Sequence, residues 1–347
     1  MSDNSMTAVR LHAPGALQVD TVPIPRPGPG EVQIQVLRTG ICGTDLHLYD
    51  GWQMGSMVTF PPMPAIIGHE ISGIVSELGQ AVSRLKVGDR VTVQPQVYCG
   101  DCIHCQRGNP NLCTNKIKFK QGGSWADWLV VNERAVYVIP DHLSFDLAAM
   151  SEPLGCALRA VERSRLCPGD NVFVAGGGTI GLMLIALARR LGANLIFASE
   201  PHESRRALAL AVGADIVIDP AAEPPADVVI QATNGIGADV SLEAAGMATS
   251  TSDCLASARA GGRVMLVGLS EPSQMLSVNQ LDVVFRELDI SGSILQANNM
   301  ESVLRLLPSL GLEAIITHHL PLSDAEPGIQ LCKSGEATKV LFDVSQP

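Results

Sequence analysis

Four cysteines lie within fifteen residues of one another, at Cys99, Cys102, Cys105 and Cys113. Four thiolates are the ligand set of a closed tetrahedral zinc site, in which no coordination position is left open for a substrate. Glycine, asparagine and proline residues between the cysteines supply turns that let one loop wrap an ion. The alternative, four incidental free thiols, explains such close spacing poorly. The pattern therefore predicts a structural zinc site.

A second set of possible zinc ligands is dispersed along the chain, at Cys42, His69, Glu70 and Glu152. A catalytic zinc ion takes three protein ligands and keeps one position open, and cysteine, histidine and carboxylate side chains are suitable ligands. Each residue also has an ordinary explanation, because a lone cysteine is commonly a small buried residue and a lone histidine commonly a polar residue with satisfied hydrogen bonds. The residue types allow a catalytic zinc site without establishing one.

A glycine motif, Gly-x-Gly-x-x-Gly, begins at Gly176, directly after a predicted strand and at the start of a predicted helix. Such glycines permit a tight turn, close approach of the backbone to a pyrophosphate, and close packing of helix on strand. Nineteen residues after the motif, Glu200 ends the next predicted strand, where an acid can bind ribose hydroxyls. We assign to the cofactor site Gly176, Gly178, Thr179, Ile180, Gly181, Glu200, Arg205, Val267, Gly268 and Leu269.

The choice of cofactor depends on the residues at the adenosine ribose. The carboxylate of Glu200 would repel the 2′-phosphate of NADP, so we expect NAD. Arg205 and Arg206 on the next predicted helix could reach a phosphate, and Arg205 could instead stack on the adenine or pair with Glu200. NADP is therefore the less favoured alternative.

The elements that position these residues differ between the two parts of the chain. Residues 7–150 hold short β-like runs broken by proline and glycine, which is typical of a β-rich, barrel-like domain. The runs include residues 32–36, 71–75 and 90–93. From Asn171 onward, strands alternate with helices, which predicts a parallel, doubly wound sheet. Strands are expected over 172–175, 195–198, 239–243 and 263–267, and helices over 179–191 and 203–212.

The pattern changes again after about Gly292. A short helix is expected over 301–307 and a strand over 339–344 that could rejoin the first domain. Residues 227–232 fit either a strand by propensity or a short helix by position. We therefore expect a catalytic domain over 1–154, a nucleotide-binding domain over 155–292, and a return to the catalytic domain over 293–347.

Composition excludes several classes of protein. The chain has 347 residues, of which 46% are hydrophobic and 17% charged, which fits a globular protein of two domains. The formal net charge of −11, with lysine and arginine scattered, argues against a nucleic-acid partner. The longest strongly apolar stretch, Ile180 to Ala188, is too short to cross a membrane. We expect a cytoplasmic protein without a secretion signal, whose nine cysteines are reduced.

These motifs resemble the zinc-containing medium-chain dehydrogenases. The run Gly68-His69-Glu70-x2-Gly73-x5-Gly79-x2-Val82 is similar to that family's zinc signature. Two further runs, Gly40-Ile41-Cys42-Gly43-Thr44-Asp45-Leu46-His47 and Ser151-Glu152-Pro153-Leu154, resemble the branch that holds sorbitol, threonine and 2,3-butanediol dehydrogenases. The resemblance covers nearly the whole chain and implies an α/β fold: a GroES-like catalytic domain with a Rossmann domain inserted.

The resemblance also implies roles for individual residues. Cys42 and His69 would bind the catalytic zinc, with Glu70 or Glu152 as third ligand, and Asp45 would orient His69. The zinc would lower the pKa of a bound hydroxyl. The proton would leave through Thr44, the cofactor ribose and His47, for which the alternative is an ordinary solvated histidine.

The implied activity is oxidation of a secondary alcohol or polyol to a ketone by NAD, with two zinc ions per chain. The alternatives are a diol or amino alcohol as substrate, a zinc-free reductase of the same fold, and, more remotely, a non-catalytic zinc- and dinucleotide-binding protein. We expect a small-molecule substrate and a homo-oligomer, either a tetramer or a dimer. Leu48, Tyr49, Phe119 and residues 50–64 are expected to shape the substrate pocket, whereas Trp125, Trp128 and the four remaining cysteines are expected to pack in the core.

Overall fold

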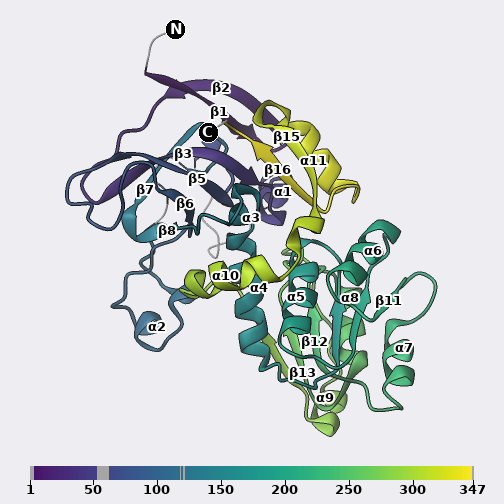
Figure 1. Cartoon of the computed structure of the whole chain (residues 1–347). Helices are drawn as coiled ribbons and strands as arrows, with labels where there is room; N and C mark the ends of the chain where they lie inside the picture. Colours follow the sequence, from purple (N-terminus) through teal and green to yellow (C-terminus); the bar gives the residue numbers. More distant parts are fainter. Residues whose placement is uncertain (1–3, 53–61, 118, 120–121, 346–347) are drawn as a thin grey trace. The chain divides into compact units, whose positions relative to one another are not determined.

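The computed structural model describes residues 4–52, 62–117, 119 and 122–345 (Figure 1). The chain forms two compact units. The first unit comprises residues 1–152, 300–308 and 316–347, and the second comprises residues 153–299 and 309–315. No helix among the described residues is long and apolar enough to cross a bilayer.

The first unit is built mainly from β-strands. Its strands are β1 (Ser5–Ala13), β2 (Ala16–Pro23), β3 (Glu31–Gly40), β4 (Ala65–Ile66), β5 (Ile71–Leu78), β6 (Arg90–Val93), β7 (Trp128–Asn132), β8 (Val136–Val138), β15 (Ile316–Pro321) and β16 (Lys339–Asp343). Its helices are α1 (Gly43–Tyr49), α2 (Ile103–Gln106), α3 (Phe145–Ala149), α10 (Met300–Leu306) and α11 (Ala325–Lys333), together with the start of α4 (Ser151–Ser164). The three β-runs expected in this part of the chain are confirmed.

Strand β3 organises the larger sheet of this unit. It pairs antiparallel with β5 along one edge, while its other edge pairs first with β7 and then with β16. Nearly all of its side chains are buried, including the apolar Val32, Ile34, Val36 and Leu37 and the polar Gln33. The pairing with β16 brings the C-terminal strand beside Gly40, two residues before Cys42.

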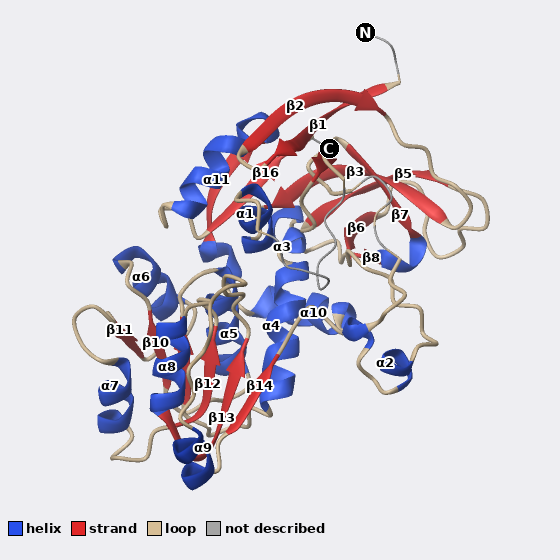
Figure 2. Cartoon of the chain, turned by 180° about the vertical axis from the view of Figure 1, so that it is seen from behind, coloured by secondary structure: helices blue, strands red, loops and turns tan. Residues whose placement is uncertain are grey.

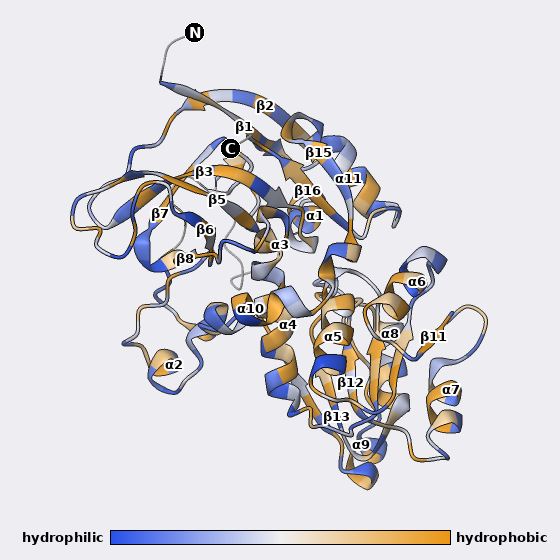
Figure 3. Cartoon of the chain, viewed as in Figure 1, coloured by the Kyte–Doolittle hydropathy of each residue, from blue (hydrophilic) through white to orange (hydrophobic). Residues whose placement is uncertain are grey.

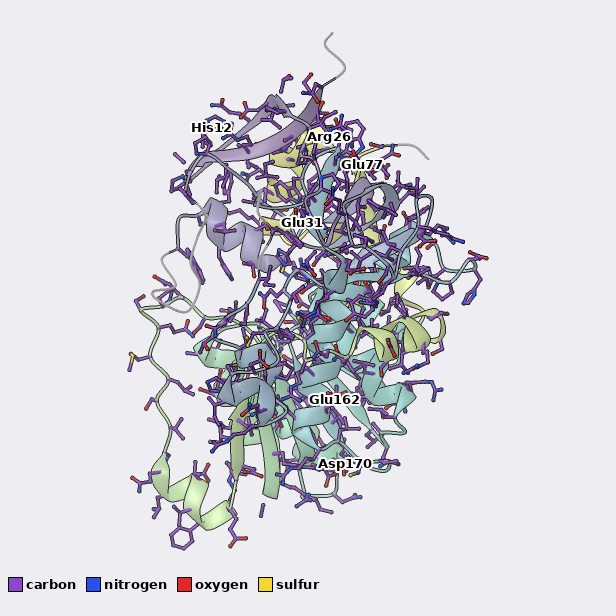
Figure 4. All side chains as sticks on the ribbon, turned by 90° about the vertical axis from the view of Figure 1, so that its left-hand side faces the viewer. His12, Arg26, Glu31, Glu77, Glu162 and Asp170 are labelled. Carbon is purple, nitrogen blue, oxygen red and sulfur yellow. The ribbon has the colours of Figure 1, made fainter. Side chains whose placement is uncertain are left out.

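Side chains from several strands stabilise this unit. One core cluster contains Trp125, whose ring lies edge-on to Phe342 at 5.1 Å between ring centroids. At the surface, Arg26 and Glu77 form an ion pair of 2.6 Å between the segment after β2 and strand β5 (Figure 4). Both of these side chains are exposed, so the pair contributes little to stability.

The second unit alternates strands and helices. Its strands are β9 (Val172–Ala175), β10 (Ile196–Ser199), β11 (Ile216–Ile218), β12 (Ala238–Glu243), β13 (Ala258–Leu266) and β14 (Asp289–Gly292). Its helices are α5 (Thr179–Arg190), α6 (Glu203–Ala211), α7 (Pro225–Ala232), α8 (Ala248–Ser257) and α9 (Gln280–Arg286), together with most of α4.

The six strands of this unit form one parallel sheet in the order β11-β10-β9-β12-β13-β14. Numbered along the chain this order is 3-2-1-4-5-6, the arrangement of dinucleotide-binding domains, and it places a switch point between β9 and β12. Helices α5 and α8 pack against the central strands (Figure 2). Helix α5 is apolar over most of its surface (Figure 3), which fits the burial of residues 181–188. The predicted α/β fold class is confirmed.

The structure decides one segment that the sequence left open and moves the start of one expected strand. Residues 227–232, which fitted either a strand or a short helix, belong to helix α7, whose first turn contains Pro225, so the position between two strands of a parallel sheet outweighs the β-propensity of the valines. The strand expected over 263–267 begins earlier, at Ala258, and ends at Leu266. Its early part contains two glycines, and its pairing with β12 shifts register there, which is why the apolar pattern marked only the second half.

Candidate functional site

The four-cysteine lobe is assembled as a compact cluster. The ligand atoms of Cys99, Cys102, Cys105 and Cys113 all lie within 4.8 Å of one another. The sulfur–sulfur distances are 3.4 Å for Cys113–Cys99, 3.6 Å for Cys102–Cys105 and 4.0 Å for Cys99–Cys105. A tetrahedron with zinc–sulfur bonds of about 2.3 Å has edges of about 3.8 Å. The lobe therefore fits a zinc ion in size, ligand type and ligand number.

The electrostatics of the lobe also suit a cation. Backbone N–H groups donate to the sulfurs of Cys99 and Cys113, and hydrogen bonds from the backbone lower the pKa of Cys102 to about 5. Burial raises the pKa of Cys105 to about 12. Without a metal the cluster must share protons among neighbouring sulfurs, and a divalent cation removes that need because it binds thiolates.

Cys42 and His69 come from different loops and meet in the first unit. Cys42 follows strand β3 and caps helix α1, and His69 lies between β4 and β5. Their side chains are joined by a hydrogen bond. Burial alone lowers the pKa of His69, but Cys42, Asp45 and Glu152 together raise it well above its ordinary value. The acidic side chains around this ring are the electrostatic environment that a divalent cation favours.

Asp45 connects the two loops that carry Cys42 and His69. Its carboxylate accepts hydrogen bonds from the backbone N–H of Cys42 at 2.9 Å and of Gly68 at 3.2 Å. Its distance to Nδ1 of His69 is 3.8 Å, which is too long for a hydrogen bond. Asp45 is fully buried, and burial raises its pKa. In this structure it therefore holds the ligand loops by their backbones rather than by the imidazole ring.

The two candidate carboxylates have different surroundings. Glu152 lies in the first turn of α4, is almost fully buried, and is close enough to His69 to raise the pKa of that ring. Glu70 is also buried, but its carboxylate pairs with the ammonium of Lys339. Among the described residues, only the cysteine lobe brings three or more ligand atoms within 4.8 Å of one another. The side chains of Cys42, His69, Glu70 and Glu152 thus do not form a compact ligand cluster like that of the four cysteines.

The residues of the expected proton path are only partly brought together. The thiol of Cys42 and the hydroxyl of Thr44 are 3.8 Å apart. The ring of His47 stacks on Trp52 with centroids 3.8 Å apart, and burial lowers the pKa of His47. Within the described part of the chain, the contacts of these side chains do not join Thr44 to His47.

The glycine loop of the second unit lies at the carboxyl end of β9. A Cβ atom on Gly181 would meet the carbonyl oxygen of Gly176 at 1.8 Å, so only glycine lets α5 pack so closely on this turn. Glu200 follows β10 and is buried, and its carboxylate accepts from Gly177 N–H at 2.7 Å and from the ring Nδ1 of His202 at 2.7 Å. The acid is therefore fixed directly beside the glycine loop.

Arg206 is occupied by local contacts. It donates to the carbonyl oxygens of Glu200 and Pro201 and forms an ion pair with Asp219 at 3.4 Å. Arg205 is half-buried on the same helix. The expected cofactor residues Val267, Gly268 and Leu269 follow β13, and the first two donate backbone N–H bonds to the carbonyl oxygen of Glu243.

Two buried charged residues were not identified from the sequence. Lys339 is 1% exposed and contacts Glu70 and the carbonyl oxygen of Ile41. Glu243, at the end of β12, accepts from Ala245 N–H and Gly246 N–H and so shapes the loop beside the switch point. Lys339 lies far from the other site residues in the sequence. Glu243 could have been identified from the sequence, since it is an acid at the carboxyl end of a predicted central strand.

The residues expected to line the pocket or to pack in the core contact the core clusters to different extents. Leu48 and Tyr49 pack against one core cluster and Phe119 against another, and residues 53–61 of the expected pocket loop lie outside the described residues. Trp125 is buried as predicted, and Trp128 is partly buried against the same cluster. Cys254 is a core residue, whereas Cys167 is exposed because it lies in a turn before β9, so its assignment to the core was wrong.

Comparison with known proteins identifies the family. Residues 28–141 match the alcohol dehydrogenase GroES-like domain, and residues 179–309 match the zinc-binding dehydrogenase domain. The chain is 36% identical to L-threonine 3-dehydrogenase of Pyrococcus furiosus over 99% of each chain. It is 33% identical to D-arabitol-phosphate dehydrogenase of Enterococcus avium, over 98% of this chain and 97% of the other.

Solved structures agree with the sequence matches. A putative zinc-binding dehydrogenase from Sinorhizobium meliloti bound to NADP is 34% identical, with a TM-score of 0.90 over 99% of this chain and 100% of the other. Both units and both sets of candidate zinc ligands lie within the aligned length. The chain belongs to the zinc-containing medium-chain dehydrogenases, in the branch that holds the threonine and polyol dehydrogenases.

Proposed function

We propose that the chain is a zinc-dependent dehydrogenase that oxidises a secondary hydroxyl group of a small polar substrate and transfers hydride to NAD. The observation that carries this proposal is that the buried carboxylate of Asp45 accepts hydrogen bonds from the backbone N–H groups of Cys42 and Gly68, and so connects the Cys42 loop to the His69 loop. A buried acid that joins two distant ligand loops is typical of a preorganised metal site. We also propose a second zinc ion, without a catalytic role, in the four-cysteine lobe.

Cys42, His69 and one glutamate would hold the catalytic zinc, which when bound supplies a Lewis acid that lowers the pKa of a substrate hydroxyl. The chain's own residues provide the rest. Burial lowers the pKa of His47, so its ring is neutral near pH 7 and a ring nitrogen can accept a proton. The Thr44 hydroxyl, which lies 3.8 Å from the Cys42 thiol, would hydrogen-bond the substrate hydroxyl.

The substrate class is proposed from the ligand set and the relatives together. We propose a polyol or polyol phosphate, because both candidates for the third zinc ligand are glutamates rather than a cysteine and one relative is an arabitol-phosphate dehydrogenase. The second candidate is a β-hydroxy amino acid, which the similarity to L-threonine 3-dehydrogenases favours. The two classes differ in charge, since only the amino acid carries an ammonium group beside the reacting hydroxyl.

A substrate panel separates these candidates. With NAD present, we expect NADH formation from at least one sugar alcohol or sugar-alcohol phosphate, at a kcat/KM at least about tenfold above that for L-threonine. The measurement is absorbance at the NADH band with sugar alcohols, their phosphates, vicinal diols and L-threonine. Preference for L-threonine would select the second candidate. Absence of turnover with every member would favour a non-catalytic zinc- and dinucleotide-binding protein.

The preference for NAD is tested at Glu200. We expect wild type to favour NAD over NADP, because a 2′-phosphate would meet the fixed carboxylate. Glu200→Ala should lower the ratio of kcat/KM with NAD to kcat/KM with NADP by about tenfold or more, which corresponds to about 1.4 kcal/mol. Glu203→Ala removes the same charge from an exposed position in the first turn of α6 and is the matched control. Wild-type preference for NADP would show that the arginines of α6 determine the choice.

A further inference from the structure

A histidine lies directly beside the acid that is expected to bind the adenosine ribose. His202 follows Glu200 by two residues, at the N-cap of helix α6, and its Nδ1 is 2.7 Å from Oε1 of Glu200. The backbone N–H of His202 donates to the same oxygen at 2.9 Å. The proposed function uses the carboxylate of Glu200 and leaves the ring of His202 without a role.

The contact with Glu200 fixes which nitrogen of the His202 ring carries a proton. An ionised carboxylate only accepts hydrogen bonds, so Nδ1 is the donor. In the neutral ring Nε2 then carries a lone pair, and in the protonated ring Nε2 is a second N–H donor. In the part of the chain that the structure describes, the ring hydrogen-bonds to Glu200 alone, and the side chain of His202 is 45% exposed. The ring can therefore take a second partner through Nε2.

The charge of this pair depends on the protonation of the ring. The pair is negative while the ring is neutral, and it has no net charge once the ring is protonated. Both oxygens of Glu200 are held by backbone donors, Oε2 by the N–H of Gly177 at 2.7 Å and Oε1 by the N–H of His202. The carboxylate therefore keeps its position in either state, and a phosphate beside it would be repelled in the first state and accepted in the second.

The other charged side chains around the turn from β10 to α6 are Glu203, Arg205 and Arg206 on α6 and Asp219 after β11. Arg206 pairs with Asp219 and donates to the carbonyl oxygens of Glu200 and Pro201, so its guanidinium group is engaged. Of the side-chain types at this turn, only histidine ordinarily changes its charge between about pH 5 and pH 8. A pH dependence of ligand binding at this turn would therefore arise at His202.

We propose that His202 is a specificity-determining residue that makes the choice between NAD and NADP depend on pH, because its protonated ring offsets the charge of Glu200 and donates from Nε2 to the 2′-phosphate of NADP. The 2′-phosphate replaces a ribose hydroxyl that an acid at the end of this strand binds, so it would meet the ring beside the carboxylate. NAD has no charged group at this position, and its affinity should change little with pH. This inference rests on the proposed function, because it assumes the adenosine ribose at Glu200.

The test measures cofactor binding to the purified full-length protein rather than turnover. The dissociation constants of NAD and NADP are determined by calorimetric titration at several values from about pH 8.5 to about pH 6. In wild type, the Kd of NADP divided by the Kd of NAD should fall at least about tenfold over this range, because a repulsion is replaced by a charge-assisted hydrogen bond. The ratio cancels pH effects in the parts of the site that both cofactors share.

His202→Gln measures the background from the cofactor itself. The 2′-phosphate takes up a proton at about pH 6, so in this variant the ratio should still change, but by no more than about threefold. His142→Gln makes the same substitution at an exposed histidine of the first unit and should keep the wild-type pH dependence. Thermal unfolding of each variant shows that it is folded.

His202→Arg tests the same idea with a positive charge that does not titrate. At about pH 8.5 this variant should bind NADP at least about tenfold more tightly than wild type does, because arginine offsets Glu200 and donates to a phosphate at every pH. Its ratio of dissociation constants should then change with pH no more than that of His202→Gln. If His202→Gln did not fold, this variant would decide alone.

Two results would overturn the proposal. One is a wild-type ratio that changes with pH no more than the ratio of His202→Gln. The other is a His202→Gln variant that binds NADP differently but keeps the wild-type pH dependence, since a ring that only holds the carboxylate in place acts at every pH. The proposed preference for NAD fails separately, if wild type binds NADP more tightly than NAD even at about pH 8.5. A lack of turnover with every alcohol would likewise leave the binding result standing.

Discussion

Replacing Cys42 by serine, or His69 by alanine, is expected to lower kcat/KM by at least about 10³-fold while NAD still binds. The loss corresponds to about 4 kcal/mol of transition-state stabilisation, in the range that a Lewis-acid metal supplies. Cofactor binding should persist because the glycine loop and Glu200 belong to the second unit, whereas Cys42 and His69 belong to the first. The measurements are steady-state kinetics, zinc content, and calorimetric titration with NAD.

Cys167→Ser is the control for this experiment. Its thiol is exposed in a turn and lies outside both candidate zinc sites, so turnover and zinc content should be unchanged. Turnover within a few-fold of wild type in either Cys42→Ser or His69→Ala would rule out the zinc mechanism. Loss of NAD binding together with turnover would instead point to a folding defect.

The second large effect is expected in the four-cysteine lobe. Cys102→Ser removes one of four thiolates and should release zinc from the lobe, because a structural site needs all its ligands. Zinc binding there stabilises the fold, since the folded lobe binds the ion and the unfolded chain binds it weakly. We expect the melting temperature to fall by at least about 3 °C, as a loss of about 2–3 kcal/mol would give in a chain of this size.

The matched control is Cys332→Ser, also in the first unit and partly buried but outside the lobe. It should keep wild-type zinc content and lose little stability. Zinc content measured beside the melting curve identifies the cause of any change in Cys102→Ser. Normal stability with full zinc content in that variant would contradict the proposed role of the lobe.

Most elements of the second unit followed from sequence pattern. The strand over 172–175 has the predicted bounds, and helix α5 ends one residue before the expected position. Strong periodicity and a glycine turn specify such elements locally. Helix α7 was ambiguous, because the propensity of Val228, Val229 and Ile230 opposes the connection that two parallel strands require. Topology decided that segment.

The candidate site was predictable in its residue types but only partly in its contacts. Asp45 was expected to orient the His69 ring, yet its carboxylate accepts hydrogen bonds from the backbone N–H groups of Cys42 and Gly68. Backbone contacts depend on how two loops meet, and local spacing does not encode this. The stacking of His47 on Trp52 was likewise not expected, because neither ring has a periodic pattern that would place it.

The difference between the two zinc sites shows what the sequence by itself determined. The lobe draws its four ligands from fifteen consecutive residues, so their spacing alone specified a tetrahedral cluster, and the structure gathers them within 4.8 Å. The glycine loop and Glu200 were similarly specified, because one strand–turn–helix unit and the next strand contain them. Short-range geometry is set by local turns and needs little help from the rest of the fold.

Only the tertiary structure distinguished Glu70 from Glu152. As residue types the two glutamates are equivalent, and nothing near either one in the sequence shows which of them pairs with a cation. The distinction comes from Lys339, which the pairing of β16 with β3 brings next to Glu70 although 269 residues separate them. A buried carboxylate takes its charge state and its partner from whatever the fold packs against it, and for Glu70 that partner comes from the other end of the chain.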